Sequence, residues 1–189
     1  MDKLKQMIIE KGEIREGNIL KVDNFLNHQI DGEFLYEVGQ EFYKLFKDQE
    51  ITKILTIEVS GIAVALMASL FFKVPIVFAK KTESLNLDKD IYKSKVFSYS
   101  KRKEYNIMIS KRYINKDDKV LIIDDFLAVG NAMTGLIDVS KQGGAEIKGI
   151  GIVIEKGFQS GGKMLRSQGY NLKSLAIIDD MSNGEIKFR

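Results

Sequence analysis

A continuous apolar run that ends in two adjacent acids constrains the fold of this chain most. Residues 120–123 are Val, Leu, Ile and Ile, and Asp124 and Asp125 follow them directly. Because all four residues are apolar, rather than every second one, the pattern predicts a strand buried on both faces. Such strands lie at the centre of parallel sheets, which need helices on their faces, so this run favours an α/β fold.

The rest of the chain alternates between strand and helix patterns. Residues 53–57 and 75–79 are typical of strands, and the apolar stretch 61–72 between them predicts a buried helix. Asp31 is placed to cap an earlier helix, in which apolar residues recur at intervals of three and four. Further patterns predict a first helix before Gly12, a short strand plus loop at 19–29, helices at 131–142 and 161–169, and strands at 150–154, 175–178 and 185–188. With right-handed crossovers, residues 1–189 form one domain with a central, mainly parallel sheet flanked by helices.

Two segments stand apart from this alternation. Residues 95–100 and 105–110 flank a charged stretch and predict an exposed hairpin. Its tip carries Lys101, Arg102 and Lys103. Three charges without an aromatic platform are a weak signal for nucleic acid, and a net charge of +3 adds little, so we expect no nucleic-acid partner.

The amino-acid composition excludes several kinds of catalytic and metal-binding site. The chain has no cysteine, which excludes disulfides, thiolate nucleophiles, iron–sulfur clusters and thiolate zinc sites. His28 is the one histidine, so a multi-histidine metal site is impossible, and we expect at most a minor role for it. The longest apolar run is far shorter than the roughly 20 residues that span a bilayer. We therefore expect no membrane partner and, with no export signal at the N-terminus, a cytoplasmic location.

The acidic pair and the loop after it predict a site for a phosphorylated sugar. Ligands of open α/β sheets bind at the carboxyl ends of strands. There, Asp124 and Asp125 can accept hydrogen bonds from neighbouring ribose hydroxyls, while the N–H groups of residues 128–132 and the dipole of the next helix suit a phosphate. The residues alone also allow solvated acids before a helix cap, or an acidic pair that binds magnesium.

Residues 120–132 closely resemble the signature of type I phosphoribosyltransferases, which use 5-phosphoribosyl 1-diphosphate (PRPP). The resemblance implies that Asp124 and Asp125 act at the reacting sugar by holding its hydroxyls. It also implies that the 5-phosphate is wrapped by Ala128, Val129, Gly130, Asn131 and Ala132. Many members of the superfamily have threonine or serine where Val129 and Ala132 stand, so backbone amides must hold more of the phosphate here.

Two flanking segments narrow the resemblance to the bacterial xanthine phosphoribosyltransferases. Residues 20–31 resemble their base-binding hood, and residues 149–159 resemble the strand end that meets the base. The resemblance implies that Leu20, Asn27 and Lys156 contact xanthine, with the hood formed by about residues 1–30 and the segment from about 156 onward. Xanthine has oxygens on C2 and C6, and an ammonium and an amide supply the donors they need. Taken alone, Lys156 could be a solvated lysine and Asn27 a turn residue.

Residues 58–63 resemble the pyrophosphate loop of the same family. The resemblance implies that Ser60 and Gly61 bind the diphosphate through backbone N–H groups at a helix start, with Lys80 and Lys81 adding positive charge. It also implies a non-proline cis peptide near Val59-Ser60 and a loop at residues 97–105 that closes over the site. A plain strand-to-helix turn and an ordinary hairpin tip are the alternatives.

The resemblance runs nearly end to end and implies a glycosyltransferase of purine salvage. The expected reaction joins the phosphoribosyl group of PRPP to N9 of xanthine, giving xanthosine 5′-monophosphate (XMP) and pyrophosphate. We expect Mg²⁺ to be carried by PRPP rather than bound directly by the chain, and we expect a homodimer. The alternatives are a non-catalytic regulator that senses PRPP with the same fold, and a hypoxanthine or guanine phosphoribosyltransferase.

Overall fold

A six-stranded sheet forms the centre of the computed structural model, which describes residues 1–16, 18–81, 90–98 and 103–189. The strand order is β10-β9-β8-β7-β3-β4. The strands are β3 (Lys53–Ile57), β4 (Ile76–Ala79), β7 (Lys119–Leu127), β8 (Glu146–Lys156), β9 (Leu172–Asp180) and β10 (Lys187–Phe188). All neighbours pair in parallel except β10, which is antiparallel to β9. The predicted mainly parallel α/β architecture is confirmed.

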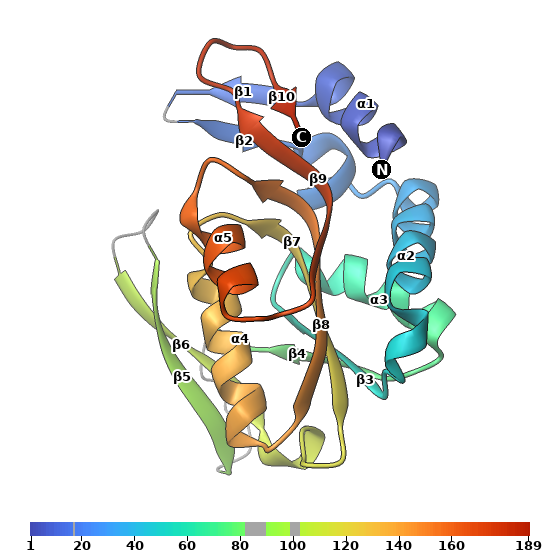
Figure 1. Ribbon diagram of the computed structural model, residues 1–189, viewed down its shortest axis with the longest axis vertical. Coiled ribbons are helices and arrows are strands. Elements are labelled where there is room, and N and C mark those ends of the chain that lie inside the picture. The colour runs from blue at the N-terminus through green and yellow to red at the C-terminus, as the bar shows by residue number, and fades with distance from the viewer. Residues whose placement is uncertain (17, 82–89, 99–102) are drawn as a thin grey trace.

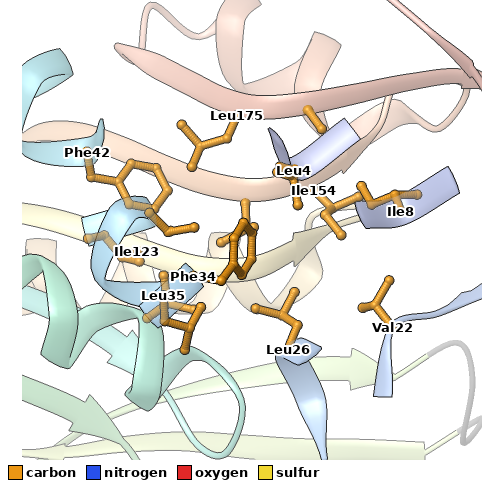
Figure 2. Packing of buried hydrophobic residues seen from close by; sticks show 14 of the residues in the cluster. Leu4, Ile8, Val22, Leu26, Phe34, Leu35, Phe42, Ile123, Ile154 and Leu175 are labelled. Carbon is orange, nitrogen blue, oxygen red and sulfur yellow. The ribbon is translucent and has the colours of Figure 1, made fainter. Parts of the chain in front are cut away.

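Helices cover both faces of this sheet (Figure 1). Helices α2 (Gly32–Phe46) and α3 (Gly61–Phe72) lie on one face, and α4 (Asn131–Gln142) and α5 (Ser160–Ser167) lie on the other. Ile123 of β7 belongs to the buried cluster under α2, part of which Figure 2 shows, whereas Ile122 belongs to the cluster under α4. Two apolar faces on one strand explain why the run 120–123 has no polar alternation.

Helix α2 begins as the sequence predicts. The side chain of Asp31 caps it by accepting a hydrogen bond from the Phe34 N–H at 3.0 Å. Phe34 and Phe42 are fully buried on the face that packs against the sheet, and this packing supplies most of the helix's stability.

The N-terminal segment packs at the end of the sheet where β9 and β10 lie (Figure 1). It comprises α1 (Asp2–Lys11), β1 (Glu13–Arg15), β2 (Ile19–Lys21) and a π-helical turn, η1 (Asp23–Asn27). The Met1 ammonium donates to the Leu175 carbonyl at 2.7 Å, and Lys5 Nζ donates to the Arg189 carbonyl at 2.8 Å. The expected short strand is β2, but the expected loop is η1, because burial of Phe25 and Leu26 holds the chain in a tight turn.

A two-stranded antiparallel sheet packs outside α4 (Figure 1). Its strands are β5 (Ile91–Ser98) and β6 (Lys103–Ser110). Strand β5 starts and ends earlier than predicted, whereas β6 starts earlier and ends at the predicted residue. The expected hairpin is therefore present, but residues 99–102 of its tip, with Lys101 and Arg102, lie outside the described residues. Two 3₁₀ turns, η2 (Lys47–Gln49) and η3 (Lys111–Tyr113), complete the described chain. Within the described ranges, no helix is long and apolar enough to cross a membrane.

Candidate active site at the carboxyl end of the sheet

The acidic pair lies at the end of β7, as predicted. Asp124 is 6% exposed, and its Oδ1 accepts a hydrogen bond from the Asp125 N–H at 3.0 Å. Burial, and next the neighbouring charge of Asp125, raise the pKa of Asp124 well above its usual range. Asp125 is less buried than Asp124. The pair therefore combines Asp124, whose surroundings disfavour its ionised form, with Asp125, which is more accessible to solvent.

The loop after the pair turns sharply into α4. Gly130 has a φ of +97°, a left-handed conformation that side-chain-bearing residues rarely adopt, and it precedes the first helical residue, Asn131. The Ala128 carbonyl accepts from the Gly161 N–H at 3.0 Å, which holds the loop against the start of α5. The first N–H groups of a helix have no partner inside it. Those of α4 begin at Asn131, so the predicted phosphate loop has donors at its end.

The predicted pyrophosphate loop approaches the acidic pair closely. A Cβ atom on Gly61, the first residue of α3, would lie 2.2 Å from Thr56 Oγ1 and 2.9 Å from Asp124 Oδ1. Ser60 precedes Gly61 and makes no side-chain cap bond to the helix. The cis peptide lies between Glu58 and Val59, one bond before the position expected. Glycine at position 61 thus lets the backbone at the start of α3 contact the carboxyl group of Asp124.

Of the two predicted lysines, the structure places the side chain of Lys81 near the acids. The Lys81 ammonium lies 5.9 Å from the centre of the Tyr105 ring, and its charge acts to lower the pKa of Asp124. Lys80 pairs through its backbone with Met108 of β6, at 2.9 and 3.0 Å. Lys81 therefore brings positive charge to the expected diphosphate position, while the backbone of Lys80 joins β4 to the hairpin.

A cavity of about 540 Å³ opens beside these groups. Its walls include Asp124 and all five residues of the predicted phosphate loop. The other lining residues are Ile19, Phe97, Tyr105, Phe126, Leu127, Met133 and Gln159. The structure therefore brings Asp124 and the predicted phosphate loop together around one space, whereas Asp125 lies outside the lining residues. Such a concave site with a few polar groups is typical of small-molecule binding.

Two of the lining polar residues, Tyr105 and Gln159, are not among the site residues named from the sequence, although Tyr105 ends the segment 97–105 that the resemblance expects to close over the site. Burial, and then the charge of Asp124, raise the pKa of Tyr105 above its ordinary value. Gln159 Oε1 is buried, and among the described residues no group hydrogen-bonds to it. Tyr105 reaches the site through the docking of the hairpin, which no local pattern reveals. Gln159 lies within the segment 149–159 that carries the family resemblance, and that is the one signal that points to it.

The three predicted base contacts lie outside the residues that line this cavity. Leu20 is buried in the core with α1, and its neighbour Ile19 faces the cavity instead. Asn27 is exposed at the end of η1. Lys156 ends β8, and its Nζ donates to the Asn18 carbonyl at 3.0 Å, while burial lowers its pKa. Lys156 therefore ties the strand end to the N-terminal segment.

A buried ion pair supports the end of β8 next to Lys156. The two terminal nitrogens of Arg166, Nη1 and Nη2, each donate to one oxygen of the Glu155 carboxylate at 2.7 Å, and Ser174 donates to it as well. Burial alone pushes the pKa of Glu155 upward, but the hydrogen bonds from Arg166 and Ser174 together hold its pKa below the usual value. The carboxylate therefore stays charged and fixes α5 and β9 against the strand that carries Lys156.

The carboxylates at this site fit a magnesium ion only if a bound substrate supplies most of the ion's ligands. In the part of the chain that the structure describes, no three Asp, Glu or His side chains come together as a metal cluster. Asp124 and Asp125 offer carboxylate oxygens at this site. Since Mg²⁺ keeps several waters and phosphate oxygens in its octahedral shell, this pair fits an ion held mainly by a phosphorylated substrate.

Comparison with known proteins identifies the family of this chain. Residues 23–183 match the family model described as the phosphoribosyl transferase domain. The chain is 57% identical over its whole length to xanthine phosphoribosyltransferase 1 of Clostridium perfringens, and the match covers all of that protein. It is 53% identical to the xanthine phosphoribosyltransferase of Clostridium novyi, again with both chains fully covered.

Solved structures show the same fold at much lower identity. An adenine phosphoribosyltransferase from Rhodothermus marinus superposes with a TM-score of 0.76 at 21% identity, covering 94% of this chain and 97% of the other. One from Thermoanaerobacter pseudethanolicus gives 0.75 at 19% identity, covering 93% and 98%. At such low sequence identity, the structures establish the type I fold alone. The full-length sequence relatives narrow the family assignment further. The chain belongs to the phosphoribosyltransferase family and, within it, to the xanthine phosphoribosyltransferases.

Proposed function

We propose that the chain transfers the 5-phosphoribosyl group of PRPP to N9 of xanthine, producing XMP and pyrophosphate in purine salvage. The observation that carries this proposal is the acidic pair at the end of β7, of which the buried Asp124 lines one cavity with the loop 128–132. The full-length likeness to proteins named xanthine phosphoribosyltransferases supports the choice of base.

The sugar is proposed to lie between the acids and the loop. The carboxylates of Asp124 and Asp125 would accept hydrogen bonds from the two ribose hydroxyls, which are neighbouring donors. The 5-phosphate would accept from backbone N–H groups of residues 128–132, at the positive end of the α4 dipole. Val129 and Ala132 have no hydroxyl to donate, so these contacts rest on the backbone.

The diphosphate is proposed to lie toward Ser60 and Gly61, at the start of α3. Backbone N–H groups there, together with the ammonium groups of Lys80 and Lys81, would offset its negative charge. Magnesium carried by PRPP would supply further neutralisation of the leaving group. Asp124 and Asp125 would hold the ribose hydroxyls beside this charge.

Transfer itself requires N9 of the purine to face C1 of the ribose. As the bond from N9 to C1 forms, the bond from C1 to the diphosphate oxygen breaks, and its electron pair leaves with pyrophosphate. The proton that the imidazole ring of xanthine loses passes to water or to the departing pyrophosphate. The protein's part is mainly to position both reactants and to stabilise the charge that develops on the ribose ring. Lys156, Asn27 and Leu20 are proposed to hold xanthine, with Lys156 donating to one of its carbonyl oxygens.

We also propose a domain organisation, an oligomeric state and a cellular location for the protein. Residues 1–189 would form a single phosphoribosyltransferase domain, with its hood made of about residues 1–30 and the segment from about 156 onward. Helix α3 leaves Leu66 and Leu70 about half exposed, at 46% and 55%, which supports a homodimer that covers them. The reaction belongs to the cytoplasm, where PRPP and free purines meet, and we propose that location.

One experiment separates this function from its rivals. The protein is incubated with PRPP, Mg²⁺ and equimolar xanthine, guanine and hypoxanthine, and the nucleotide formed is identified by mass spectrometry. We expect XMP to predominate. Predominant guanosine or inosine monophosphate would contradict the choice of xanthine, and no nucleotide despite measurable PRPP binding would favour a non-catalytic PRPP sensor.

A further inference from the structure

The hairpin of β5 and β6 is a separate sheet that docks on α4. Within the described residues, its backbone connection to the main sheet is the bridge between Lys80 and Met108. Val96 and Ile107 are buried where the hairpin contacts Gly135 of α4, and a Cβ on Gly135 would lie 2.5 and 2.6 Å from them. The position of the hairpin is therefore set largely by its fit to α4.

Amide side chains at the two ends of α4 bond to the backbone of β5. Asn131, the first residue of the helix, donates from Nδ2 to the Phe97 carbonyl at 2.7 Å. Gln142, the last residue, donates to the Lys93 carbonyl at 2.9 Å and accepts from the Lys93 N–H at 3.3 Å. Twelve residues separate these ends by about 17 Å along the helix axis.

The two hydrogen-bonded ends of α4 differ in whether their residues line the cavity. Asn131 belongs to the loop proposed to bind the 5-phosphate, and its partner Phe97 lines the same cavity. Tyr105, on the neighbouring strand, lines that cavity as well. Gln142 and Lys93 lie outside the lining residues. A change at Asn131 therefore alters a wall of the site, whereas a change at Gln142 alters the hairpin away from it.

We propose that Asn131 is a positioning residue that couples the phosphate loop to the hairpin wall formed by Phe97 and Tyr105. The inference rests on the proposed function, because it takes residues 128–132 as the phosphate site. The backbone N–H of Asn131 would bind phosphate while its side chain holds Phe97. A phosphate that restrains this backbone also restrains the donor of the bond to the hairpin. Since such coupling is reciprocal, a docked hairpin strengthens phosphate binding by the same factor.

Three variants separate this role from general stability. Asn131→Leu removes the amide donor, keeps the backbone N–H and adds no charge. Asn131→Gln keeps the amide on a side chain one methylene longer and serves as the conservative rescue. Gln142→Leu is the matched control, because it removes an amide bond to the same strand from the other end of α4.

The readout is hydrogen exchange of the amides at 91–98 and 103–110, with and without saturating ribose 5-phosphate. In the wild-type protein, we expect the ligand to slow exchange in both strands. In Asn131→Leu, ribose 5-phosphate should still bind, roughly five- to tenfold more weakly as for one lost hydrogen bond, but without slowing hairpin exchange. Asn131→Gln should restore part of the response. Gln142→Leu should exchange faster near Lys93 and keep the ligand response.

Steady-state kinetics give an independent readout. For Asn131→Leu, we expect kcat to fall along with the affinity for PRPP, while the KM for xanthine stays near the wild-type value. Full ligand-induced protection of the hairpin in Asn131→Leu would overturn the inference, as would wild-type binding of ribose 5-phosphate with no change in the hairpin. If ribose 5-phosphate does not bind the wild-type protein, the phosphate loop itself is misassigned and the proposed function fails with it.

Discussion

Replacing Gly61 with alanine tests whether the start of α3 must touch the acidic pair. The added Cβ would lie 2.2 Å from Thr56 Oγ1 and 2.9 Å from Asp124 Oδ1. Both neighbours are buried, at 0% and 6% exposure, so neither side chain can swing into solvent. To reach an ordinary contact of about 3.5 Å, the start of α3 must move by about 1 Å.

The expected costs follow from that displacement. Overpacking of this kind destabilises proteins by about 1–3 kcal/mol, and a helical alanine in place of glycine returns about 0.5–1 kcal/mol. We therefore expect Gly61→Ala to lower the free energy of unfolding by about 1–2 kcal/mol. Because a shift of about 1 Å in a positioning element can cost about a hundredfold in rate, kcat/KM for PRPP should fall far more than stability does.

Urea unfolding and initial-rate kinetics measure the two effects. Gly32→Ala is the matched control, since a Cβ on Gly32, at the start of α2, meets nothing within 4 Å. That variant should be as stable and as active as the wild-type protein, or slightly more stable. A Gly61→Ala enzyme with wild-type kcat/KM for PRPP would refute the claim that the close approach of Gly61 to Asp124 is needed for the site.

Three further substitutions address other parts of the site. Asp124→Asn should raise the free energy of unfolding at pH 7 while reducing turnover by orders of magnitude. Burial and Asp125 raise the pKa of Asp124, so the contribution of this carboxyl group to stability falls as pH rises above about 3.9; the stability difference between the wild type and Asp124→Asn at pH 4 and at pH 7 measures this, and a variant less stable than the wild type at pH 7 would count against it. Arg166→Met leaves Glu155 buried without its cation and should cost about 2–3 kcal/mol in urea unfolding, less than for a fully buried pair because 37% of the Arg166 side chain is exposed. Since the pKa of Glu155 is lowered, its contribution is present above about pH 4.3 and lost as pH falls through the folded value, so the stability difference between the wild type and Arg166→Met should shrink at pH 3, and an unchanged difference would argue against the assignment. Lys156→Met should raise the KM for xanthine about tenfold or more, the cost of a lost charged hydrogen bond, with little change in the KM for PRPP; an equal rise in both would place Lys156 elsewhere.

The sequence predicts the parts of this molecule that local patterns encode. The apolar run 120–123 identifies the central strand, and Asp31 identifies the start of α2, because strand burial and helix capping act over a few residues. The position of the acidic pair at a ligand-binding edge is predicted too, because the pair directly follows a buried strand and ligands bind at the carboxyl ends of such strands.

Features that depend on docking between distant segments could not be predicted in this way. Tyr105 reaches the cavity because the hairpin packs on α4, and the bond from Asn131 to Phe97 joins residues 34 positions apart. In β2, Leu20 packs into the core while its neighbour Ile19 faces the cavity. Alternate residues of a strand face opposite sides, and three residues are too few to reveal from sequence which side is buried.

A crystal structure with XMP bound tests the central claim most directly. The account predicts both ribose hydroxyls within about 3 Å of the carboxylates of Asp124 and Asp125, and the 5-phosphate on the backbone N–H groups of residues 128–132. A nucleotide whose sugar lies away from the acids, or whose phosphate lies outside that loop, would contradict the account.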